Sequence, residues 1–379
     1  MRSVSLILLT ILLCLNPRAQ AEIRVTDLRG KEIVLAQPAQ RIILGEGRFL
    51  AALGVLDDAP LGRVAGMMGE FKRYDPDSFA QWAAHFPELP EVPLIGAASA
   101  DTVSLEKIIS LRPDLAVFGL SGHGPTAEAE RVLQVLEKAG IPVACIDFRD
   151  QPIRNTPRSI RVLGALLGQS ERAEAFAQFY EEALAEVLEP LAAAEVDAPS
   201  VFLHSHVGLS DGEWRSMGDA LMGRFISTAG GDNIATSILP GPAGTISSEF
   251  LFSHQPDLYI GTSIGAAAYR ERFPARIILG AGVSPAMAQA SFRRATEGKR
   301  VGQLQAVREG RAFAIWHHFY NSPLNIAAVQ AIAKWLHPEL FAELDPEATL
   351  AELFERFQPV DLDGTYWIQL SVTEETPAP

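Results

Sequence analysis

Five histidines stand out as side chains that could do chemistry, because each lies in a loop just after a short apolar segment of the kind that forms a strand. They are His123, His204, His206, His317 and His318. Converging histidine and carboxylate side chains can bind a bare metal ion, and a single histidine or tyrosine can be an axial ligand of haem iron. None of the five shows the close spacing of a compact metal motif. A receptor for a bare metal ion or for haem remains open at this point.

A serine motif raises a second kind of chemistry. The segment Gly261-Thr262-Ser263-Ile264-Gly265 matches the G-x-S-x-G pattern of a hydrolase nucleophile and follows an apolar segment. His317, later in the chain, is a candidate base. No HGGG-like segment for an oxyanion hole is visible in the sequence. A secreted serine hydrolase that uses Ser263 is therefore the alternative from a different class of protein.

The composition is that of a folded, acidic protein. The chain has 379 residues, of which 48% are hydrophobic and 21% are charged, and two domains are typical of this length. Its 46 acidic residues outnumber the 32 basic ones, which gives a formal net charge of −14. That charge repels phosphate groups, and no long run of lysine or arginine offsets it. We therefore expect no binding to nucleic acid or to an anionic membrane surface.

Residues 1–21 have the features of an export signal. Arg2 supplies a positive start, residues 4–15 form an apolar core, and Ala19-Gln20-Ala21 is a typical cleavage site. We expect cleavage after Ala21 and a periplasmic mature protein. The apolar core is too short for a membrane-spanning helix. Cys145 is then the one remaining cysteine, so no disulfide within the mature chain is expected.

Short apolar segments alternate with amphipathic helical segments, which predicts an α/β protein with mostly parallel sheets. The expected strands are residues 41–44, 63–66, 115–119, 142–147, 200–203, 258–261 and 312–316. Each ends in a loop rich in glycine, serine or histidine. Because ligands bind beyond the carboxyl ends of parallel strands, these loops are the expected binding region.

An internal repeat indicates two similar lobes. Residues 104–115 read SLEKIISLRPDL and residues 247–258 read SSEFLFSHQPDL, with six of twelve positions identical. Both copies predict a helix that ends before Pro-Asp and leads into an apolar strand. A shared type of turn would explain the common Pro-Asp-Leu ending, but it does not explain Glu106 and Glu249 at one register of the two helices.

A strongly helical segment lies between the two copies. Ser170 is a candidate N-cap, and apolar residues then follow helical spacing up to Pro190. One long helix between two lobes predicts a stiff connection. The expected domains are an N-terminal α/β lobe at residues 22–154, a linker-helix region at 155–195 and a C-terminal α/β lobe at 196–379.

Several short motifs occur in a fixed order across residues 22–357. They are Val25-Thr26-Asp27 with Gly30-Lys31-Glu32-Ile33, Arg41-Ile42-Ile43, the segment 104–115, Gly230-Gly231-Asp232-Asn233-Ile234 with the segment 246–249, and the segment 306–311. Together they resemble the periplasmic solute-binding proteins of ABC importers, of the branch that carries iron–siderophore complexes and cobalamin. The segment 317–341 resembles the members that bind iron complexes in particular.

This resemblance implies two Rossmann-like lobes with a ligand cleft between them, and a binding function without catalysis or a cofactor. It also implies that Glu106 and Glu249 dock onto arginines of an inner-membrane permease, which works with its ATPase. Two carboxylates at matching places in both lobes suit a two-fold partner with paired cations. For either glutamate alone, a solvated helix position is the alternative. The expected partners are an iron–siderophore complex and this permease, and the protein is expected to be a monomer.

The side chains expected to bind the ligand lie in loops that follow strands. A ferric siderophore already coordinates its metal, so its receptor needs aromatic walls and a few donors for the oxygens of the ligand. His317 and His318 are adjacent on an extended segment and should point in opposite directions, and His318 is taken as the one that faces the cleft. The predicted binding residues are Arg48, Ser121, His123, His206, Trp214, Ser263, Tyr269 and His318.

Overall fold

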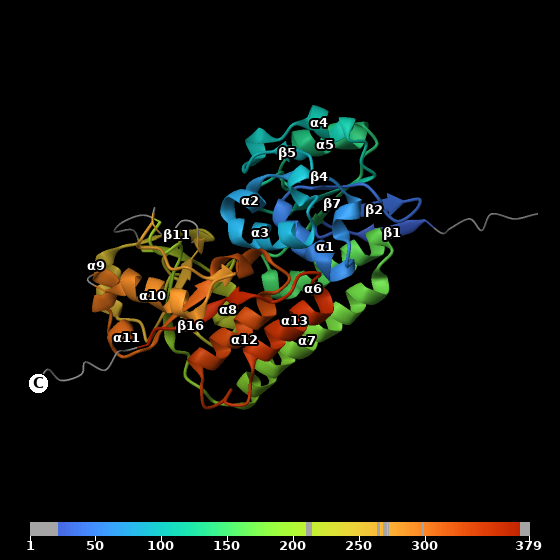
Figure 1. The fold of residues 1–379 in the computed structure, drawn as a ribbon. Helices are drawn as coiled ribbons and strands as arrows, with labels where there is room; N and C mark the ends of the chain where they lie inside the picture. Colours follow the sequence, from blue (N-terminus) through green and yellow to red (C-terminus); the bar gives the residue numbers. More distant parts are fainter. Residues whose placement is uncertain are drawn as a thin grey trace, which may run out of the picture.

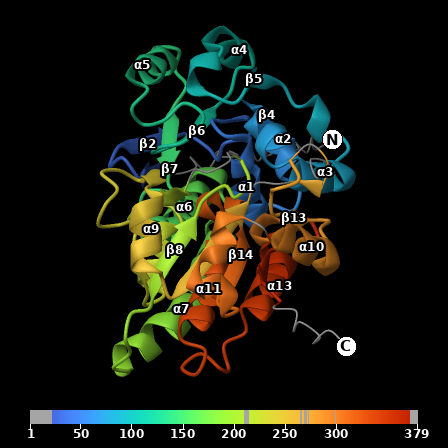
Figure 2. The same cartoon turned by 90° about the vertical axis from the view of Figure 1, so that its left-hand side faces the viewer.

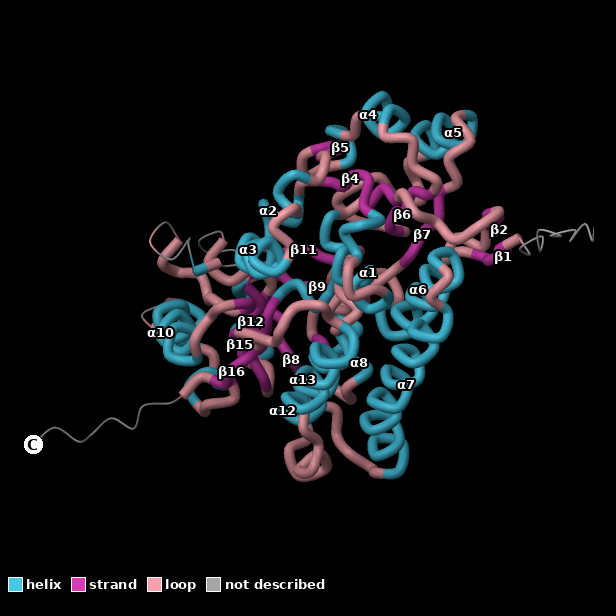
Figure 3. Tube along the Cα trace, turned by 45° about the vertical axis from the view of Figure 1, so that its right-hand side comes forward, coloured by secondary structure: helices cyan, strands magenta, loops and turns pink. Residues whose placement is uncertain are grey.

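The computed structural model contains two α/β lobes, each built on its own five-stranded sheet (Figure 1). It describes residues 22–209, 214–263, 266, 267, 271, 273–297 and 299–371. The strands fall into two separate groups, one in each lobe (Figure 3). The predicted fold class, two lobes with mostly parallel sheets, is confirmed.

The sheet of the N-terminal lobe is entirely parallel, in the order β5-β4-β3-β6-β7. Its strands are β3 (Ile42–Leu44), β4 (Val64–Met68), β5 (Leu94–Gly96), β6 (Leu115–Gly119) and β7 (Val143–Ile146). An antiparallel hairpin of β1 (Ile23–Thr26) and β2 (Glu32–Leu35) precedes them. The central strands are buried on both faces, which is why they read as continuous apolar runs.

Short helices cover this sheet. The α-helices are α1 (Leu50–Leu56), α2 (Glu70–Tyr74), α3 (Pro76–His85), α4 (Leu105–Ser110) and α5 (Glu130–Lys138). The 3-10 helices are η1 (Gly47–Phe49), η2 (Pro60–Arg63), η3 (Leu89–Glu91) and η4 (Ala100–Thr102). Ile43, Phe118 and Cys145 form part of the apolar cluster on one sheet face, whereas Leu44 and Val117 belong to the main core on the other.

The sheet of the C-terminal lobe has the order β10-β8-β12-β14-β16, and only its edge strand β16 is antiparallel. Its strands are β8 (Ser200–His204), β10 (Asp232–Asn233), β12 (Leu258–Ser263), β14 (Ala312–Trp316) and β16 (Trp367–Gln369). Two small antiparallel pairs join β9 (Trp214–Met217) to β11 (Ala243–Ile246) and β13 (Gly280–Ala281) to β15 (Gly364–Thr365).

The helices of this lobe surround its sheet (Figure 2). They are α8 (Gly223–Thr228), α9 (Ser248–His254), α10 (Pro285–Thr296), α11 (Gln305–Arg308), α12 (Asn325–Leu336) and α13 (Pro346–Phe357), with the 3-10 helices η6 (Arg300–Gln303) and η7 (His317–Asn321). All seven strands expected from the sequence are present, and Leu115–Gly119 and Ala312–Trp316 have the predicted bounds.

Two helices connect the lobes. The predicted long linker helix is α7 (Ser170–Ala193), and α6 (Pro152–Leu167) comes before it and packs closely against it. Gly168, at φ 70°, ends α6 in the left-handed conformation that favours glycine. Helix α7 contacts α1 of one lobe and α12 of the other, and it runs along one side of the molecule (Figure 1). The Tyr180 hydroxyl on α7 donates to Asn325 Oδ1 at 2.8 Å.

The two copies of the internal repeat form equivalent hydrogen bonds. The side chains of Ser104 and Ser247 cap α4 and α9 by accepting from the backbone N–H three residues later, at 3.2 and 3.1 Å. At the far end, Asp114 accepts from the backbone N–H of Arg41, and Asp257 from that of Ser200, both at 2.9 Å. Each aspartate thus fixes the start of a neighbouring strand in its own lobe.

Cys145 lies in β7 with no exposed surface. Burial raises the pKa of its thiol to about 12. It is the one cysteine among the described residues, and it is not in a disulfide. No helix in the described part of the chain is long and apolar enough to span a membrane.

Candidate ligand-binding site

A cavity of about 280 Å³ lies between the lobes. The N-terminal lobe contributes side chains from the loops after β6 and β7, and the C-terminal lobe contributes the loops after β8 and β14 and the β9–β11 pair. These are the carboxyl ends of the parallel strands, as expected for a ligand site in an α/β protein. The lining residues are His123, Arg149, Ser205, His206, Arg215, Ser216, Met217, Leu221, Ala243, Gly244, Thr245, His317 and Tyr320.

Glu46, in the loop after β3, is the centre of a buried polar network beside this cavity. Its Oε2 accepts from Arg149 Nη2 at 2.7 Å, from Asn321 Nδ2 at 2.9 Å and from Arg48 Nη2 at 3.1 Å. Its Oε1 accepts from the backbone N–H of His123 at 3.1 Å. Burial opposes ionisation, but Arg149 and Arg48 outweigh it and hold the pKa of the Glu46 carboxyl below its ordinary value.

Arg48, predicted to bind the ligand, instead spans the interface between the lobes. Its Nη1 lies 3.0 Å from Nδ1 of His318 and donates to the Tyr320 hydroxyl at 3.2 Å. Its backbone N–H donates to Glu70 Oε1 at 3.1 Å. Because the guanidinium is buried among these groups, Arg48 is absent from the wall of the cleft cavity.

His318 is also part of the interface, and its tautomer follows from its partners. Arginine only donates, so Nδ1 of His318 must accept from Arg48, and Nε2 then carries the hydrogen that it donates to the Tyr74 carbonyl at 3.0 Å. Both ring nitrogens are therefore used. His317, not His318, lines the cavity. The two residues lie in a 3-10 helix rather than on an extended strand, so the alternation expected from the sequence does not apply.

His206 and His123 line the cavity from opposite lobes. Burial lowers the pKa of both side chains to about 4, aided by Arg48 and Arg149 at His123 and by Arg215 and Arg276 at His206. Both rings are therefore neutral at pH 7. The ring of His206 lies 4.1 Å from that of His317, centroid to centroid.

Tyr320 joins the two sides of the cavity. Its hydroxyl lies 3.3 Å from Nε2 of His123, and its ring lies 4.9 Å from the guanidinium carbon of Arg149. The sequence did not single out Arg149 or Arg215 as binding residues. Arg149 follows β7, so the rule that ligands lie beyond the ends of parallel strands could have found it.

Three other predicted residues lie away from the cavity or outside the described residues. The Ser121 hydroxyl donates to Asp150 Oδ1 at 2.6 Å and does not line the cavity. Trp214 is 5% exposed and packs in the core of the C-terminal lobe, where its indole N–H donates to Ser248 Oγ at 2.8 Å. It begins strand β9 and points inward, which the turn-like sequence around it did not indicate. Tyr269 lies outside the described residues.

Ser263 is buried at the end of β12, and its hydroxyl donates to the Ile277 carbonyl. His317, the candidate base, instead pairs through Nδ1 with the Thr262 hydroxyl at 2.8 Å. The structure therefore does not pair the serine with this base. The end of the G-x-S-x-G motif lies outside the described residues.

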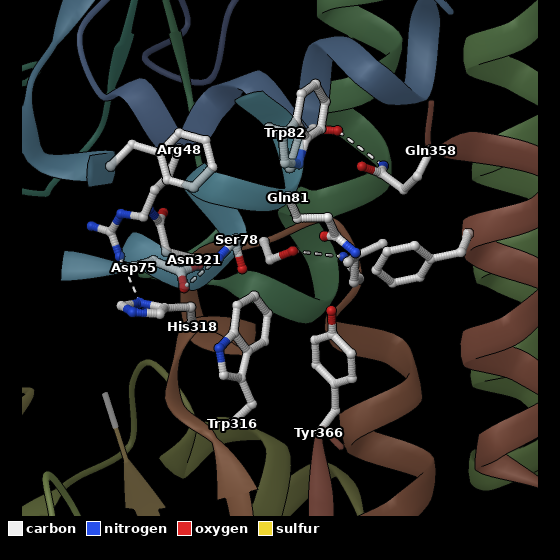
Figure 4. Close-up of a pocket in the computed structure, with 15 residues that line it drawn as sticks. Arg48, Asp75, Ser78, Gln81, Trp82, Trp316, His318, Asn321, Gln358 and Tyr366 are labelled. Carbon is white, nitrogen blue, oxygen red and sulfur yellow. Dashed lines mark hydrogen bonds between the residues drawn. The ribbon is translucent and has the colours of Figure 1, made fainter. Parts of the chain in front are cut away.

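A second cavity of about 50 Å³ lies beside Arg48, which lines it (Figure 4). Trp82 lines it from the N-terminal lobe, and Trp316 and Tyr366 line it from the C-terminal lobe. Asp75 also lines it, and burial raises the pKa of this carboxyl to about 6. Within the described residues, no group of three or more His, Cys, Asp or Glu side chains is placed to hold a metal ion.

Glu106 and Glu249 are both exposed, each in the first turn of its helix, α4 and α9. Figure 2 shows these helices on different lobes. Their positions are equivalent within the two copies of the repeat.

Two α/β lobes with a cavity between them define a two-lobed binding protein. Residues 76–289 match the family described as periplasmic binding protein, and the chain belongs to this family, the solute-binding components of ABC importers. No curated protein matches the chain by sequence.

Solved structures show the same fold at low sequence identity. The TroA-like periplasmic binding protein FepB from Veillonella parvula is 24% identical, with a TM-score of 0.81 over 92% of this chain and 100% of that one. CeuE from Helicobacter pylori, in a nickel–histidine complex, is 16% identical, with a TM-score of 0.63 over 90% and 97%. A periplasmic heme-binding protein from Pseudomonas aeruginosa is 21% identical, with a TM-score of 0.54 over 79% and 94%.

Proposed function

We propose that this protein captures a ferric siderophore in the cleft and delivers it to an ABC permease with its ATPase. The observation that carries the proposal is the cavity bounded by both lobes, with two arginines and three histidines among its lining residues. Arg149 and Arg215 on its wall suit the oxyanions of a metal chelate, and Tyr320 supplies an aromatic surface. The chelate needs no further ligand from the protein.

The proposal includes the route and the partners. Residues 1–21 direct export, with cleavage after Ala21, and the monomeric mature protein acts in the periplasm. Glu106 and Glu249 dock onto the permease. The lobes at 22–154 and 196–379, joined by the helices at 155–195, close on the ligand. Because α6 and α7 pack closely against each other between the lobes, we expect this closure to be modest.

Haem or a bare metal ion is the second candidate ligand. The neutral imidazoles of His206 and His317 in the cavity favour it, because a neutral ring nitrogen can coordinate iron or another metal. Two of the similar structures are described as periplasmic heme-binding proteins, and one is a complex with nickel and histidine.

Native mass spectrometry of protein purified from its own periplasm tests the proposal. The mass of an intact iron–siderophore complex is the expected result. Calorimetry with ferric citrate, a ferric catecholate, a ferric hydroxamate, haemin and free metal ions then compares the candidates. Ligand binding should also raise the melting temperature. Binding of haemin or a free metal ion, with none of the ferric chelates bound, would replace the proposal with the second candidate.

A further inference from the structure

The carboxylate of Glu46 joins parts of the chain that are far apart in sequence. It is 1% exposed and accepts hydrogen bonds from three segments besides its own, through His123, Arg149 and Asn321. The first two belong to the N-terminal lobe, whereas Asn321 belongs to η7 of the C-terminal lobe. One buried side chain thus links both lobes directly beside the cavity.

The same contacts determine where Arg149 points. Its Nη2 donates to Glu46 at 2.7 Å and its Nε donates to Asn321 Oδ1 at 3.0 Å. Asn321 in turn donates to Glu46 at 2.9 Å. Each member of this triangle touches the other two, so the guanidinium is held in one orientation on the cavity wall. A long arginine side chain without these partners would sample several rotamers.

The backbone next to Glu46 is adapted to the carboxylate. Gly122, in the loop after β6, has a φ of 147°, and a Cβ atom placed there would overlap Oε1 of Glu46. The following residue is His123, whose N–H donates to that same oxygen. The loop therefore needs glycine at this position, because any side chain would displace the carboxylate.

We propose that Glu46 is a positioning residue for ligand binding: it holds Arg149 on the cavity wall and ties η7 of the C-terminal lobe to the N-terminal lobe. Its hydrogen bond from Asn321 must be broken before the lobes separate, so Glu46 slows ligand release as well as orienting Arg149. The part that concerns ligand release rests on the proposed function. The part that concerns the lobe contact does not.

The first experiment needs no ligand. Hydrogen exchange of the amides at residues 317–321 and 123 is compared in the wild type, Glu46→Gln and Gly122→Ala. We expect exchange to be at least about tenfold faster in both variants, because the charge-assisted hydrogen bond between Asn321 and Glu46 across the interface is lost or weakened. The emission of Trp82 and Trp316, which line the second, smaller cavity from opposite lobes, should shift to longer wavelength as more water enters.

Asp27→Asn is the matched control. Asp27 is also a buried carboxylate with an arginine and backbone N–H groups as partners, but it lies away from the cleft, beside β7. Its loss should leave exchange at residues 317–321 unchanged. Unchanged exchange in Glu46→Gln, or equal acceleration in the control, would overturn the proposal.

A double-mutant cycle separates positioning from a general loss of stability. Dissociation rates of ferric citrate, a ferric catecholate and a ferric hydroxamate are measured for Glu46→Gln, Asn321→Ala and the double variant. For the chelate that the wild type binds, each single variant should dissociate at least about tenfold faster than the wild type. The double variant should dissociate no more than slightly faster than either single variant. Additive effects would overturn the positioning role. If the wild type binds none of the three, the proposed function fails while the exchange result still decides the lobe contact.

Discussion

Arg112 and Gln255 adopt the same left-handed backbone conformation at equivalent points in the two lobes, with φ values of 48° and 43°. Each precedes a proline and closely follows the helix that carries one of the exposed glutamates, Glu106 or Glu249. Residues other than glycine rarely adopt this conformation. Its presence at one register in both lobes shows that the sequence repeat specifies the backbone as well as the hydrogen bonds.

The first prediction concerns this conformation. Arg112→Gly should stabilise the protein by about 0.5–1 kcal/mol, because glycine adopts a positive φ without steric cost. Gln255→Gly should give a smaller gain or none, because the Gln255 side chain accepts from the backbone N–H of Gln305 at 2.9 Å. Urea unfolding of both variants measures the difference. A loss of stability in Arg112→Gly would contradict the prediction.

The second prediction concerns docking on the permease, which is tested by reversing the charges of Glu106 and Glu249. If Glu106 and Glu249 dock onto arginines of the permease as proposed, the double variant Glu106→Arg/Glu249→Arg should abolish uptake through repulsion between like charges, while ligand affinity stays unchanged. Uptake of a radiolabelled iron chelate and calorimetry measure the two effects. Glu171→Arg/Glu355→Arg is the control, because both glutamates are exposed and helical, and Glu171 is also in a first turn. Normal uptake by the first double variant would rule out these docking residues.

Replacing either aspartate of the internal repeat, Asp114 or Asp257, should destabilise the lobe that contains it. Asp114 accepts from the backbone N–H groups of Gln40 and Arg41, at 2.8 and 2.9 Å, so Asp114→Ala should cost about 1–3 kcal/mol. Asp257→Ala should have a comparable effect through Ser200. Denaturant unfolding measures both, with Asp101→Ala, an exposed aspartate in η4, as the control. Effects no larger than that of the control would show that these bonds contribute little.

The buried carboxyl of Glu70 should make the stability of the protein depend on pH, in a direction that its pKa determines. Burial raises the pKa of its carboxyl to about 7, although Arg48 opposes the rise, and Glu46 adds to it. In the unfolded chain a glutamate titrates near about 4.3. Between these values the folded state holds a proton that the unfolded state has lost, so the free energy of unfolding falls as the pH rises through this range.

Glu70→Gln should therefore gain stability relative to the wild type as the pH rises from about 4.5 to about 7, with little further change above that. Denaturant unfolding of the two proteins across this range measures the difference. The histidines of the cleft titrate in both proteins, so their effect cancels in the comparison. A difference that is constant with pH, or that falls as the pH rises, would contradict the prediction.

Local sequence pattern predicted the strands well where they were long and fully buried. Strands β6 and β14 are five-residue apolar runs between breakers, and their bounds were predicted correctly. The edge strands β5, β10 and β16 have two or three residues each and were missed, because their pairing depends on neighbours that are distant in sequence.

The site was predictable in position but only partly in composition. His123 and His206 line the cavity because they follow strands, as expected. Arg48 also follows a strand, yet its side chain turns into the interface, where Glu46, Glu70 and residues of the other lobe surround it. The orientation of the Arg48 side chain depends on contacts between the lobes, which no local sequence pattern encodes.

The buried thiol of Cys145 makes the protein suitable as an optical sensor. Maleimide dyes react with thiolates, and a thiol with a pKa of about 12 and no exposed surface forms almost none at neutral pH. A cysteine introduced in the loop after β6 that also carries His123, such as Ser121→Cys, would therefore carry the label in place of Cys145. Fluorescence from that one position would report each capture and release event in real time.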